Sequence, residues 1–341
     1  MKKLSTALLP AICCLLLLAA CGGGGKKAVE DNPFFNTEPA LKELTASIKK
    51  TPDDAALYFA RGKMLRKLKQ DTLALRDFKM ASSLDTNNAV YYSAVGDVLF
   101  EAKDLDGSVV WLQKAIAKNP NDPQAHLKIA KLFLFMQKHD KAFEQINIVM
   151  RKDVYNPEAY YLKGLVYKDM KDTGRAISSF QSALQVAPDY RDADIELGLL
   201  YTAKNDTLGL KYLDNAYKKD SADVFPLFAR GCYLQNQNKY EEAKQLFRKC
   251  IVKNTHYVDA YFHMGYIMMQ QDSIQKSFDF YDLAVKLQPD NPTAYYDRGV
   301  CNELLKKMPD AITDYKNALK LDPKYASPAS ALKRLNVKMD K

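Results

Sequence analysis

The sequence predicts an all-α protein, an elongated α-solenoid of stacked helix pairs. Seven glycines recur at steps of 33 or 34 residues, apart from one double step of 68 with Ala130 at its midpoint: Gly62, Gly96, Gly164, Gly198, Gly231, Gly265 and Gly299. Apolar residues follow each glycine at helical spacing. Proline closes several units, at Pro120, Pro188, Pro289 and Pro323, because it cannot continue a helix. A period near 34 is typical of helical arrays, so we expect one elongated domain.

The period divides residues 55–325 into eight units: 55–88, 89–122, 123–156, 157–190, 191–223, 224–257, 258–291 and 292–325. The unit 157–190 shows the pattern best, with Tyr160, Gly164, Tyr167, Ala176, Phe180, Ala183 and Pro188. Glycine at the eighth place of a unit lets its first helix (helix A) approach its second (helix B). This pattern resembles the tetratricopeptide repeat (TPR) family. The resemblance implies a right-handed solenoid whose concave groove is lined by the A helices.

The ends of the array and one inner unit depart from the repeat. Residues 39–54 fit a half-repeat that caps the N-terminal end, with Phe34 and Phe35 before it to cover the exposed apolar face. Residues 326–341 are expected to form a C-terminal capping helix. The unit 191–223 is one residue short and carries Asp194 at an aromatic place. We interpret this as a tolerated deletion in a turn, with a hinge or a change of superhelix pitch as the alternative.

The N-terminus has the features of an export signal. Lys2 and Lys3 precede an apolar stretch over residues 8–18, which is too short to span a bilayer. Residues 18–21, Leu-Ala-Ala-Cys, resemble the lipobox of bacterial lipoproteins. The resemblance implies a signal peptide over residues 1–20, cleavage before Cys21 and acylation of its thiol, followed by a flexible tether over 21–38 that includes four glycines. A plain secretory signal with a chance cysteine is the alternative.

Charge and cysteine usage narrow the class of partner. The formal charge of +9 loses Lys2 and Lys3 on cleavage, which leaves +7 in alternating basic and acidic blocks. Such blocks favour a solvated surface over a nucleic-acid interface, so we expect no nucleic acid. Cleavage before Cys21 leaves three cysteines in the folded part, Cys232, Cys250 and Cys301, with no Cys-x-x-Cys pair. This odd number gives no disulfide framework, although a Cys232–Cys250 bridge stays open.

No catalytic or cofactor motif is present. The sequence lacks Gly-x-Ser-x-Gly, His-Glu-x-x-His, a phosphate loop and a dinucleotide glycine cluster. The four histidines, His126, His139, His256 and His263, are scattered over three units, whereas a zinc site needs three or four converging ligands. We therefore expect no enzyme activity, no metal and no cofactor.

The TPR resemblance places the partner-binding groove on helix A, at the second, fifth, ninth, twelfth and thirteenth places of each unit. The fifth and ninth places give these groove candidates: Phe59, Lys63, Tyr161, Leu165, Phe228, Cys232, Phe262, Tyr266, Tyr296 and Val300. They become apolar in the last five units, which favours an extended peptide or an amphipathic helix as the partner. Packing between units is the alternative role of the aromatic side chains at the fifth place.

Basic residues of the first A helix form a second candidate site, comprising Arg61, Lys63, Arg66 and Lys67. The cluster would hold anionic peptide, glycan or lipid head groups, with a solvated face near the tether as the alternative. The carboxylate clamp of chaperone-binding TPR domains is absent, because the second unit offers Ser93 and Asp97 at the matching places.

Together these features predict a lipid-anchored adaptor that binds proteins or peptides. The resemblance to bacterial lipoproteins implies attachment to the outer membrane and a role in envelope complex assembly, with the periplasmic or cell-surface side left open. A glycan-binding surface lipoprotein that assists an outer-membrane transporter is the alternative. Such binders carry long inserted loops, whereas this chain has almost none.

Overall fold

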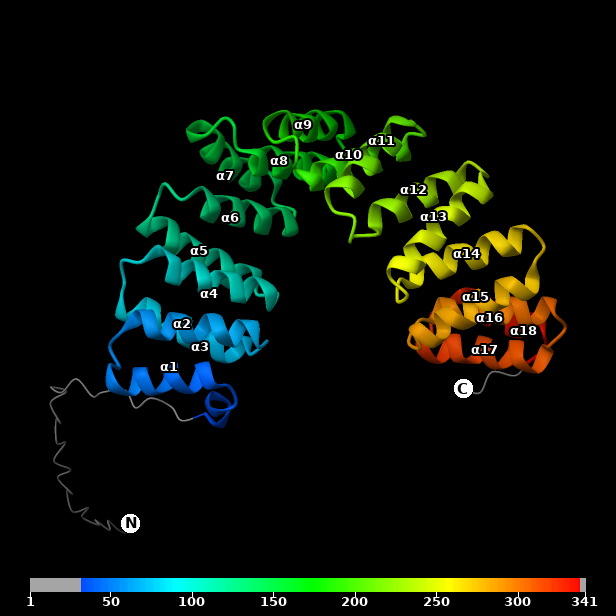
Figure 1. Ribbon diagram of the computed structural model, residues 1–341, viewed down its shortest axis with the longest axis horizontal. Helices are drawn as coiled ribbons and strands as arrows, with labels where there is room; N and C mark the ends of the chain where they lie inside the picture. Colours follow the sequence, from blue (N-terminus) through cyan, green and yellow to red (C-terminus); the bar gives the residue numbers. More distant parts are fainter. Residues whose placement is uncertain (1–31, 338–341) are drawn as a thin grey trace, which may run out of the picture. The chain divides into compact units, whose positions relative to one another are not determined.

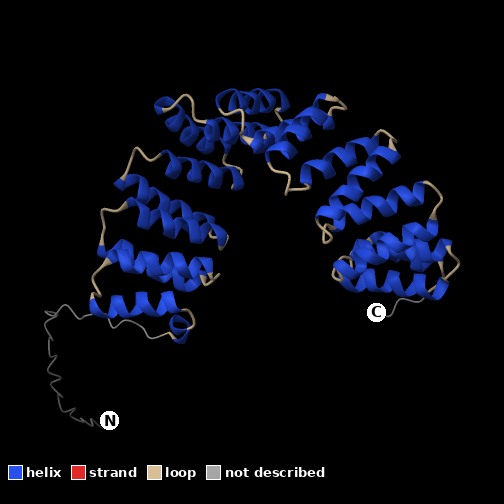
Figure 2. Cartoon of the chain, in the orientation of Figure 1, coloured by secondary structure: helices blue, strands red, loops and turns tan. Residues whose placement is uncertain are grey.

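The computed structural model describes residues 32–337, and this range holds helices joined by short loops, with no strand (Figures 1 and 2). The chain divides after Asn121 into two compact units, which are described separately. The first unit contains η1 (Pro33–Asn36), α1 (Pro39–Lys50), α2 (Ala55–Lys67), α3 (Asp71–Leu84), α4 (Ala89–Glu101) and α5 (Leu105–Lys118).

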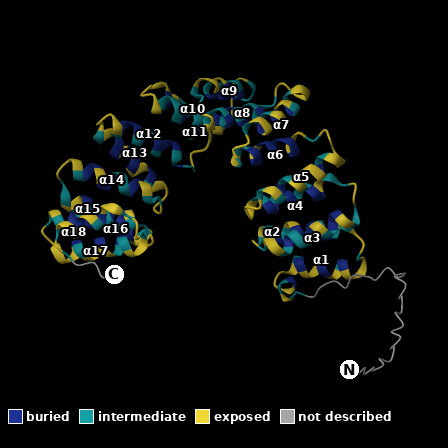
Figure 3. Cartoon of the chain, turned by 180° about the vertical axis from the view of Figure 1, so that it is seen from behind, coloured by how far each residue is buried: buried dark blue, intermediate teal, exposed yellow. Residues whose placement is uncertain are grey.

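The second unit continues the same succession of paired helices. It contains α6 (Pro123–Phe135), α7 (His139–Lys152), α8 (Pro157–Asp169), α9 (Thr173–Val186), α10 (Arg191–Ala203), α11 (Leu208–Lys219), α12 (Phe225–Asn236), α13 (Tyr240–Lys253), α14 (Val258–Gln270), α15 (Ile274–Leu287), α16 (Pro292–Leu304), α17 (Met308–Leu321) and α18 (Ala326–Arg334). From α2 to α17 the even-numbered helices are A helices and the odd-numbered ones are B helices. Buried residues lie on the faces that meet within and between pairs (Figure 3).

The eighth-place glycines set the distance between helices A and B. A methyl group on Gly164 would lie 2.5 Å from Cε1 of Phe180, and one on Gly62 would lie 2.5 Å from Cε1 of Phe78. Real carbon contacts are near 3.5–4.0 Å, so only glycine permits this approach while the ring is present. Ala130 occupies the eighth place of the unit whose B helix carries Ile146 instead of a ring, and both side chains are buried.

The inner turn between helices A and B uses a left-handed residue that is never glycine in residues 32–337. In these turns the positive-φ residues are Lys69, Lys103, Gln137, Lys171, Asn205, Asn238, Asp272 and Lys306, and Asn336 has a positive φ after the last helix, α18. In the turn at Lys171, whose φ is 63°, the N–H of Asp172 donates to the Tyr167 carbonyl at 2.9 Å and closes the end of α8. The turn is therefore held by backbone hydrogen bonds.

Helix starts are capped by acidic or amide side chains in several pairs. Asp54, Asn88, Asp122, Asn156 and Asn291 accept hydrogen bonds from amides of the first turn of α2, α4, α6, α8 and α16, respectively. Such caps satisfy backbone donors that have no partner inside the helix. The Asp and Asn residues beside the unit boundaries thus fix where each A helix begins.

Asp194, at the place where an aromatic side chain is expected, is buried and forms an ion pair. Asp194 is 1% exposed and pairs with Lys219 at the end of α11. Burial raises the pKa of this carboxyl, and the Lys219 ammonium opposes that shift. The buried carboxylate is tolerated at this place because the Lys219 ammonium, which remains accessible to solvent, pairs with it.

The N-terminal cap is built around Phe35, which is buried against Leu41, Leu65 and Phe78 of the first unit. At the other end, α18 stops at Arg334, so the expectation of a helix over 326–341 was too long. The N–H of Val337 donates to the Leu332 carbonyl at 3.0 Å, and Asn336 has a φ of 56°, which turns the chain out of the helix.

The signal peptide, Cys21 and most of the glycine tether lie outside the described residues. Within residues 32–337, no helix combines the length and the apolar character that a bilayer crossing requires.

Candidate functional site

The fifth-place aromatic side chains are half-buried and pack between repeats. The Tyr161 ring lies 5.6 Å from Phe180 of its own unit and 5.2 Å from Tyr190 at the next boundary. Phe228 repeats this arrangement with Phe247 at 5.8 Å and Tyr257 at 5.3 Å. Further ring pairs join Phe59 to Phe78 and Tyr91, Phe262 to Tyr281, and Tyr296 to Tyr315 and Tyr325. These rings hold the array together and present only part of their surface.

The ninth-place residues are more open. Tyr266 is 43% exposed and Lys63 is exposed, whereas Leu165, Cys232 and Val300 are half-buried. The Lys63 Nζ lies 5.0 Å from the centre of the Phe59 ring, a cation–π contact. Tyr266 therefore offers the largest apolar surface among the ninth-place groove candidates.

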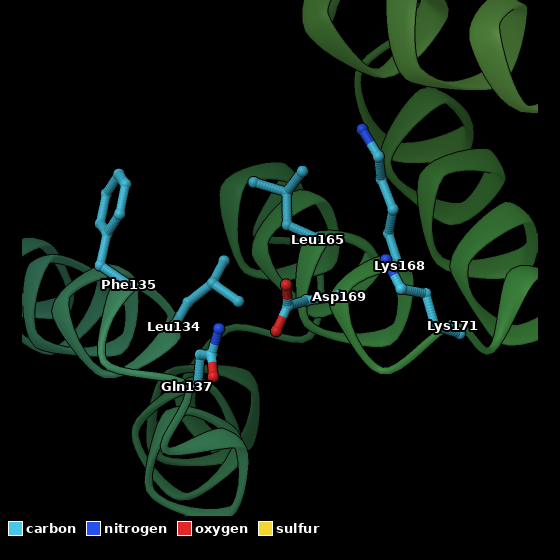
Figure 4. A pocket seen from close by; sticks show the side chains of 7 residues that line it. All are labelled: Leu134, Phe135, Gln137, Leu165, Lys168, Asp169 and Lys171. Atoms are coloured by element: carbon cyan, nitrogen blue, oxygen red, sulfur yellow. The ribbon is translucent and has the colours of Figure 1, made fainter. Parts of the chain in front are cut away.

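A cleft of about 350 Å³ opens between α6 and α8 of the second unit (Figure 4). Leu134 and Leu165 extend toward the space between the two helices, and Phe135 stands beside Leu134 with 60% of its surface exposed (Figure 4). The remaining lining residues are Gln137, Lys168, Asp169 and Lys171. An apolar floor with a polar rim at this size suits one or two side chains of a bound peptide.

An ion pair and a hydrogen bond hold charged side chains at the rim of the cleft. Lys168 Nζ contacts Glu196 Oε2 of α10 at 2.5 Å, and Asp169 Oδ2 lies 2.6 Å from His139 Nε2. These contacts hold the charged side chains beside the apolar floor.

The basic cluster predicted on α2 is wrong in part, because Arg61 is not on the surface. Its side chain is 2% exposed, and its Nε and Nη2 donate to the two carboxylate oxygens of Asp77 at 2.7 and 2.9 Å. The guanidinium also lies 4.1 Å from the centre of the Phe35 ring. The cap over α2 thus buries Arg61 together with its counter-ion.

The rest of that cluster is only partly available. Arg66 pairs with Asp71 at 3.2 Å and with Glu101 at 2.5 Å. Lys63 and Lys67 stay exposed, so the surface cluster is reduced to these two lysines.

The three cysteines of the described part are free thiols, so no Cys232–Cys250 bridge is present. Burial raises the pKa of Cys232 and Cys250 to about 12 and that of Cys301 to about 11. The thiolate is the reactive form, so these side chains are inert at neutral pH. In residues 32–337 no group of three or more His, Cys, Asp or Glu side chains could hold a metal ion.

The sequence-based choice of groove residues missed Leu134 and Phe135. They occupy the twelfth and thirteenth places of the unit 123–156, and Lys168 and Asp169 occupy the same places of the unit 157–190. Both places belong to the groove of the family, but candidates were taken from the fifth and ninth places alone. The repeat period therefore contained the information needed to find the cleft. Adding the twelfth and thirteenth places of helix A to the candidates would have identified its residues.

Models described as tetratricopeptide repeat match residues 157–190, 228–292 and 292–325, and a model described as TPR repeat matches residues 96–136. The chain contains tetratricopeptide repeats. TPR proteins are generally non-enzymatic scaffolds, and this TPR array is a scaffold for protein–protein interaction.

Solved structures agree with the α-solenoid fold. A tetratricopeptide repeat protein from Parabacteroides merdae is 14% identical with a TM-score of 0.53, and the match covers 72% of this chain and 97% of that one. A chain of the APC/C hetero-tetramer Cut9–Hcn1 is 16% identical with a TM-score of 0.53, and the match covers 86% of this chain and 58% of that one. At these identities the likeness concerns the fold.

Curated relatives share the TPR region at low identity. The DnaJ homolog subfamily C member 7 homolog of Schizosaccharomyces pombe is 25% identical over 234 residues, 67% of this chain and 45% of the relative. The human mitochondrial import receptor subunit TOM70 is 24% identical over 205 residues, 56% of this chain and 33% of the relative. Human protein O-mannosyl-transferase TMTC1 is 20% identical over 231 residues, 67% of this chain and 23% of the relative. This chain spans less than half the length of each of these three relatives.

Proposed function

We propose that this chain is a lipid-anchored adaptor of a bacterial outer membrane, which holds an extended peptide or an amphipathic helix of a partner protein against its A helices. The cleft between α6 and α8 carries the binding part of the proposal, because Phe135, Leu134 and Leu165 offer apolar surface between charged side chains whose positions are fixed. Exposed apolar surface of this kind is characteristic of interaction sites.

The anchoring part of the proposal depends on the N-terminal sequence. Acylation of Cys21 after cleavage would attach the chain to the membrane, and the following glycines would give it reach. Replacing Cys21 with serine tests this directly. We expect the Cys21→Ser protein to leave the membrane fraction and the mass of the N-terminal peptide to lose its acyl chains, and an unchanged fraction and mass would refute the anchor.

A protein-binding scaffold is favoured over an enzyme and over a glycan-binding protein. Within residues 32–337, buried charged groups such as Arg61 and Asp194 form ion pairs between helices, and we propose no enzyme activity. Glycan binding would need inserted loops, yet the turns between paired helices span only stretches such as 68–70 and 170–172.

Site-specific photo-crosslinking in cells tests the binding surface. A photoreactive phenylalanine analogue replaces Phe135, Tyr266 or Val252 in turn; Val252 serves as the matched control because it is 81% exposed on the B helix α13. We expect one shared partner to be captured at 135 and 266 and not at 252. The substitutions Phe135→Asp and Tyr266→Asp should abolish the capture, whereas Val252→Asp should not.

The thermal melt of each variant controls for folding. Two outcomes would exclude the A-helix surface as the binding site. One is capture of the partner at position 252 with the same yield as at 135 and 266. The other is capture that persists in folded Phe135→Asp and Tyr266→Asp variants.

A further inference from the structure

Two pairs of successive A helices in the second unit share a contact between the twelfth place of one helix and the sixth place of the next. Lys168 on α8 contacts Glu196 on α10, with 2.5 Å between Nζ and Oε2. Gln235 on α12 contacts His263 on α14, with 2.9 Å between Oε1 and Nδ1. In both cases the polar side chain at the sixth place has its partner on the preceding A helix.

The same two places between α14 and α16 hold a mismatched pair. The sixth place is Asp297 and the twelfth place is Met269, whose thioether has no hydrogen to donate. Asp297 makes no hydrogen bond or ion pair with any residue in 32–337. A half-buried carboxylate without a partner costs free energy, so this position calls for an explanation.

Among residues 32–337, no nearby cation compensates Asp297. The titratable groups that face it are Tyr281 of α15, Cys301 of α16 and Tyr325 before α18, and none carries a positive charge. Its neighbour Arg298 is held by Asp314 at 2.6 Å and by Asp282 at 2.7 Å. Desolvation alone raises the pKa of Asp297 to about 7.

The surroundings of Asp297 include exposed and half-exposed groove residues. Tyr266 lies one turn before Met269 on α14 and is 43% exposed, and Val300 lies one turn after Asp297 on α16 and is half-buried. Burial raises the pKa of Tyr281, and Asp297 and Tyr266 both raise it further electrostatically, so the carboxylate and the accessible ring lie near the same side chain. A cation would be attracted by both groups in different ways.

We propose that Asp297 receives a lysine or arginine side chain of the bound partner, which takes the place that Lys168 has opposite Glu196, and so makes the groove selective for basic, apolar peptides. This inference rests on the proposed function, because it names the chemistry of the peptide that the same A-helix surface binds. It adds a specificity-determining residue that the fifth and ninth places do not contain.

A random ten-residue peptide library displayed for selection on the full-length chain is the probe. The same selection is run on Asp297→Asn, on Met269→Lys and on Asp310→Asn. Asp310 is the matched control, since it is an exposed carboxylate on the B helix α17 and lacks a hydrogen bond or ion pair within the described part of the chain. The lysine of Met269→Lys imitates Lys168 and supplies an internal cation to Asp297.

We expect the unmodified chain and Asp310→Asn to enrich peptides with a fixed lysine or arginine. The Asp297→Asn and Met269→Lys variants should select apolar peptides that lack a fixed lysine or arginine. For a selected peptide, exchange of its lysine for norleucine should weaken binding to the unmodified chain about tenfold or more, and less than about twofold to Asp297→Asn. Binding of the lysine peptide should strengthen between pH 6 and pH 8, and the Asp297→Asn profile should be flat.

The outcomes separate the two proposals. If the unmodified chain and Asp297→Asn enrich basic peptides equally, Asp297 does not select the basic residue. If the Tyr266→Asp variant then fails to enrich those peptides, binding at the A-helix surface is still supported. If no selected peptide depends on Tyr266 or Phe135, the proposed function falls and this inference falls with it.

Discussion

Replacing Gly164 with alanine tests the physical basis of the repeat. The added methyl group would lie 2.5, 2.7 and 2.9 Å from three atoms of the Phe180 ring, which is fully buried between helices. Overpacking of this kind costs about 1–3 kcal/mol, and three contacts below 3.0 Å place this case at the upper end. Alanine gains about 1 kcal/mol over glycine as a helix former. We therefore expect a net loss of about 2 kcal/mol.

Gly174 in the same unit provides the matched control. A methyl group there meets nothing nearer than the Asp172 side chain at 3.8 Å, so Gly174→Ala keeps the helical gain without the clash. Urea unfolding followed by circular dichroism measures both variants, with the transition midpoint compared because repeat arrays need not unfold in one step. The reasoning is refuted if Gly164→Ala is as stable as Gly174→Ala.

A double variant tests the cause of the loss. Phe180→Ile reproduces the pair that the chain itself uses at Ala130 and Ile146. In a Phe180→Ile background, Gly164→Ala should leave the free energy of unfolding unchanged or raise it. A double-mutant cycle should therefore give a coupling energy of about 2 kcal/mol between the two positions.

Three other predictions follow from the structure. Lys171→Gly should raise the free energy of unfolding by about 1 kcal/mol, because glycine adopts the observed φ of 63° without strain; a lower urea midpoint would contradict this. Arg61→Met should cost about 3–5 kcal/mol by leaving Asp77 buried and unpaired, and Arg61→Met with Asp77→Leu should recover most of it; the explanation fails if the single variant is as stable as the double. Asp297 is neutral in the folded state up to about pH 7 but ionises in the unfolded chain near its ordinary pKa of 3.8, so between these values the folded state binds more protons and stability falls as pH rises. The advantage of Asp297→Asn in thermal melts should therefore grow by about 2 kcal/mol from pH 5 to pH 8, and a constant difference would exclude the unpaired carboxylate as its source.

Much of the fold follows from local rules. The recurrence of Gly164 and Phe180 in equivalent positions predicts close helix pairs, and caps such as Asn156 predict where helices begin. The positive φ at Lys171 was not predicted, because lysine carries no preference for that conformation and the turn is imposed by the hydrogen bonds that end α8. The role expected for the eighth-place glycine, the close approach of helices A and B, is confirmed by the contacts of Gly164.

The site was less predictable than the fold. The sequence assigns Arg61 to a basic surface because its neighbours in sequence are basic. In the structure its side chain is buried, because it pairs with Asp77 and is covered by the Phe35 ring. From the sequence, Asp297 is one of many carboxylates, and it stands out only when Met269 is found at the place where Lys168 and Gln235 supply polar partners in two other repeats. Neither assignment can be made from residue type alone, since each depends on side chains that are distant in sequence.

The sequence by itself determined the period, the helix pairs and the positions that line the A-helix face, because a repeat imposes the same local geometry on each unit. Only the tertiary structure decided which of those positions are open, which are packed and which charges lack a partner. Exposure and pairing arise from contacts between neighbouring helices, and in this chain the side chains that make those contacts differ from one repeat to the next.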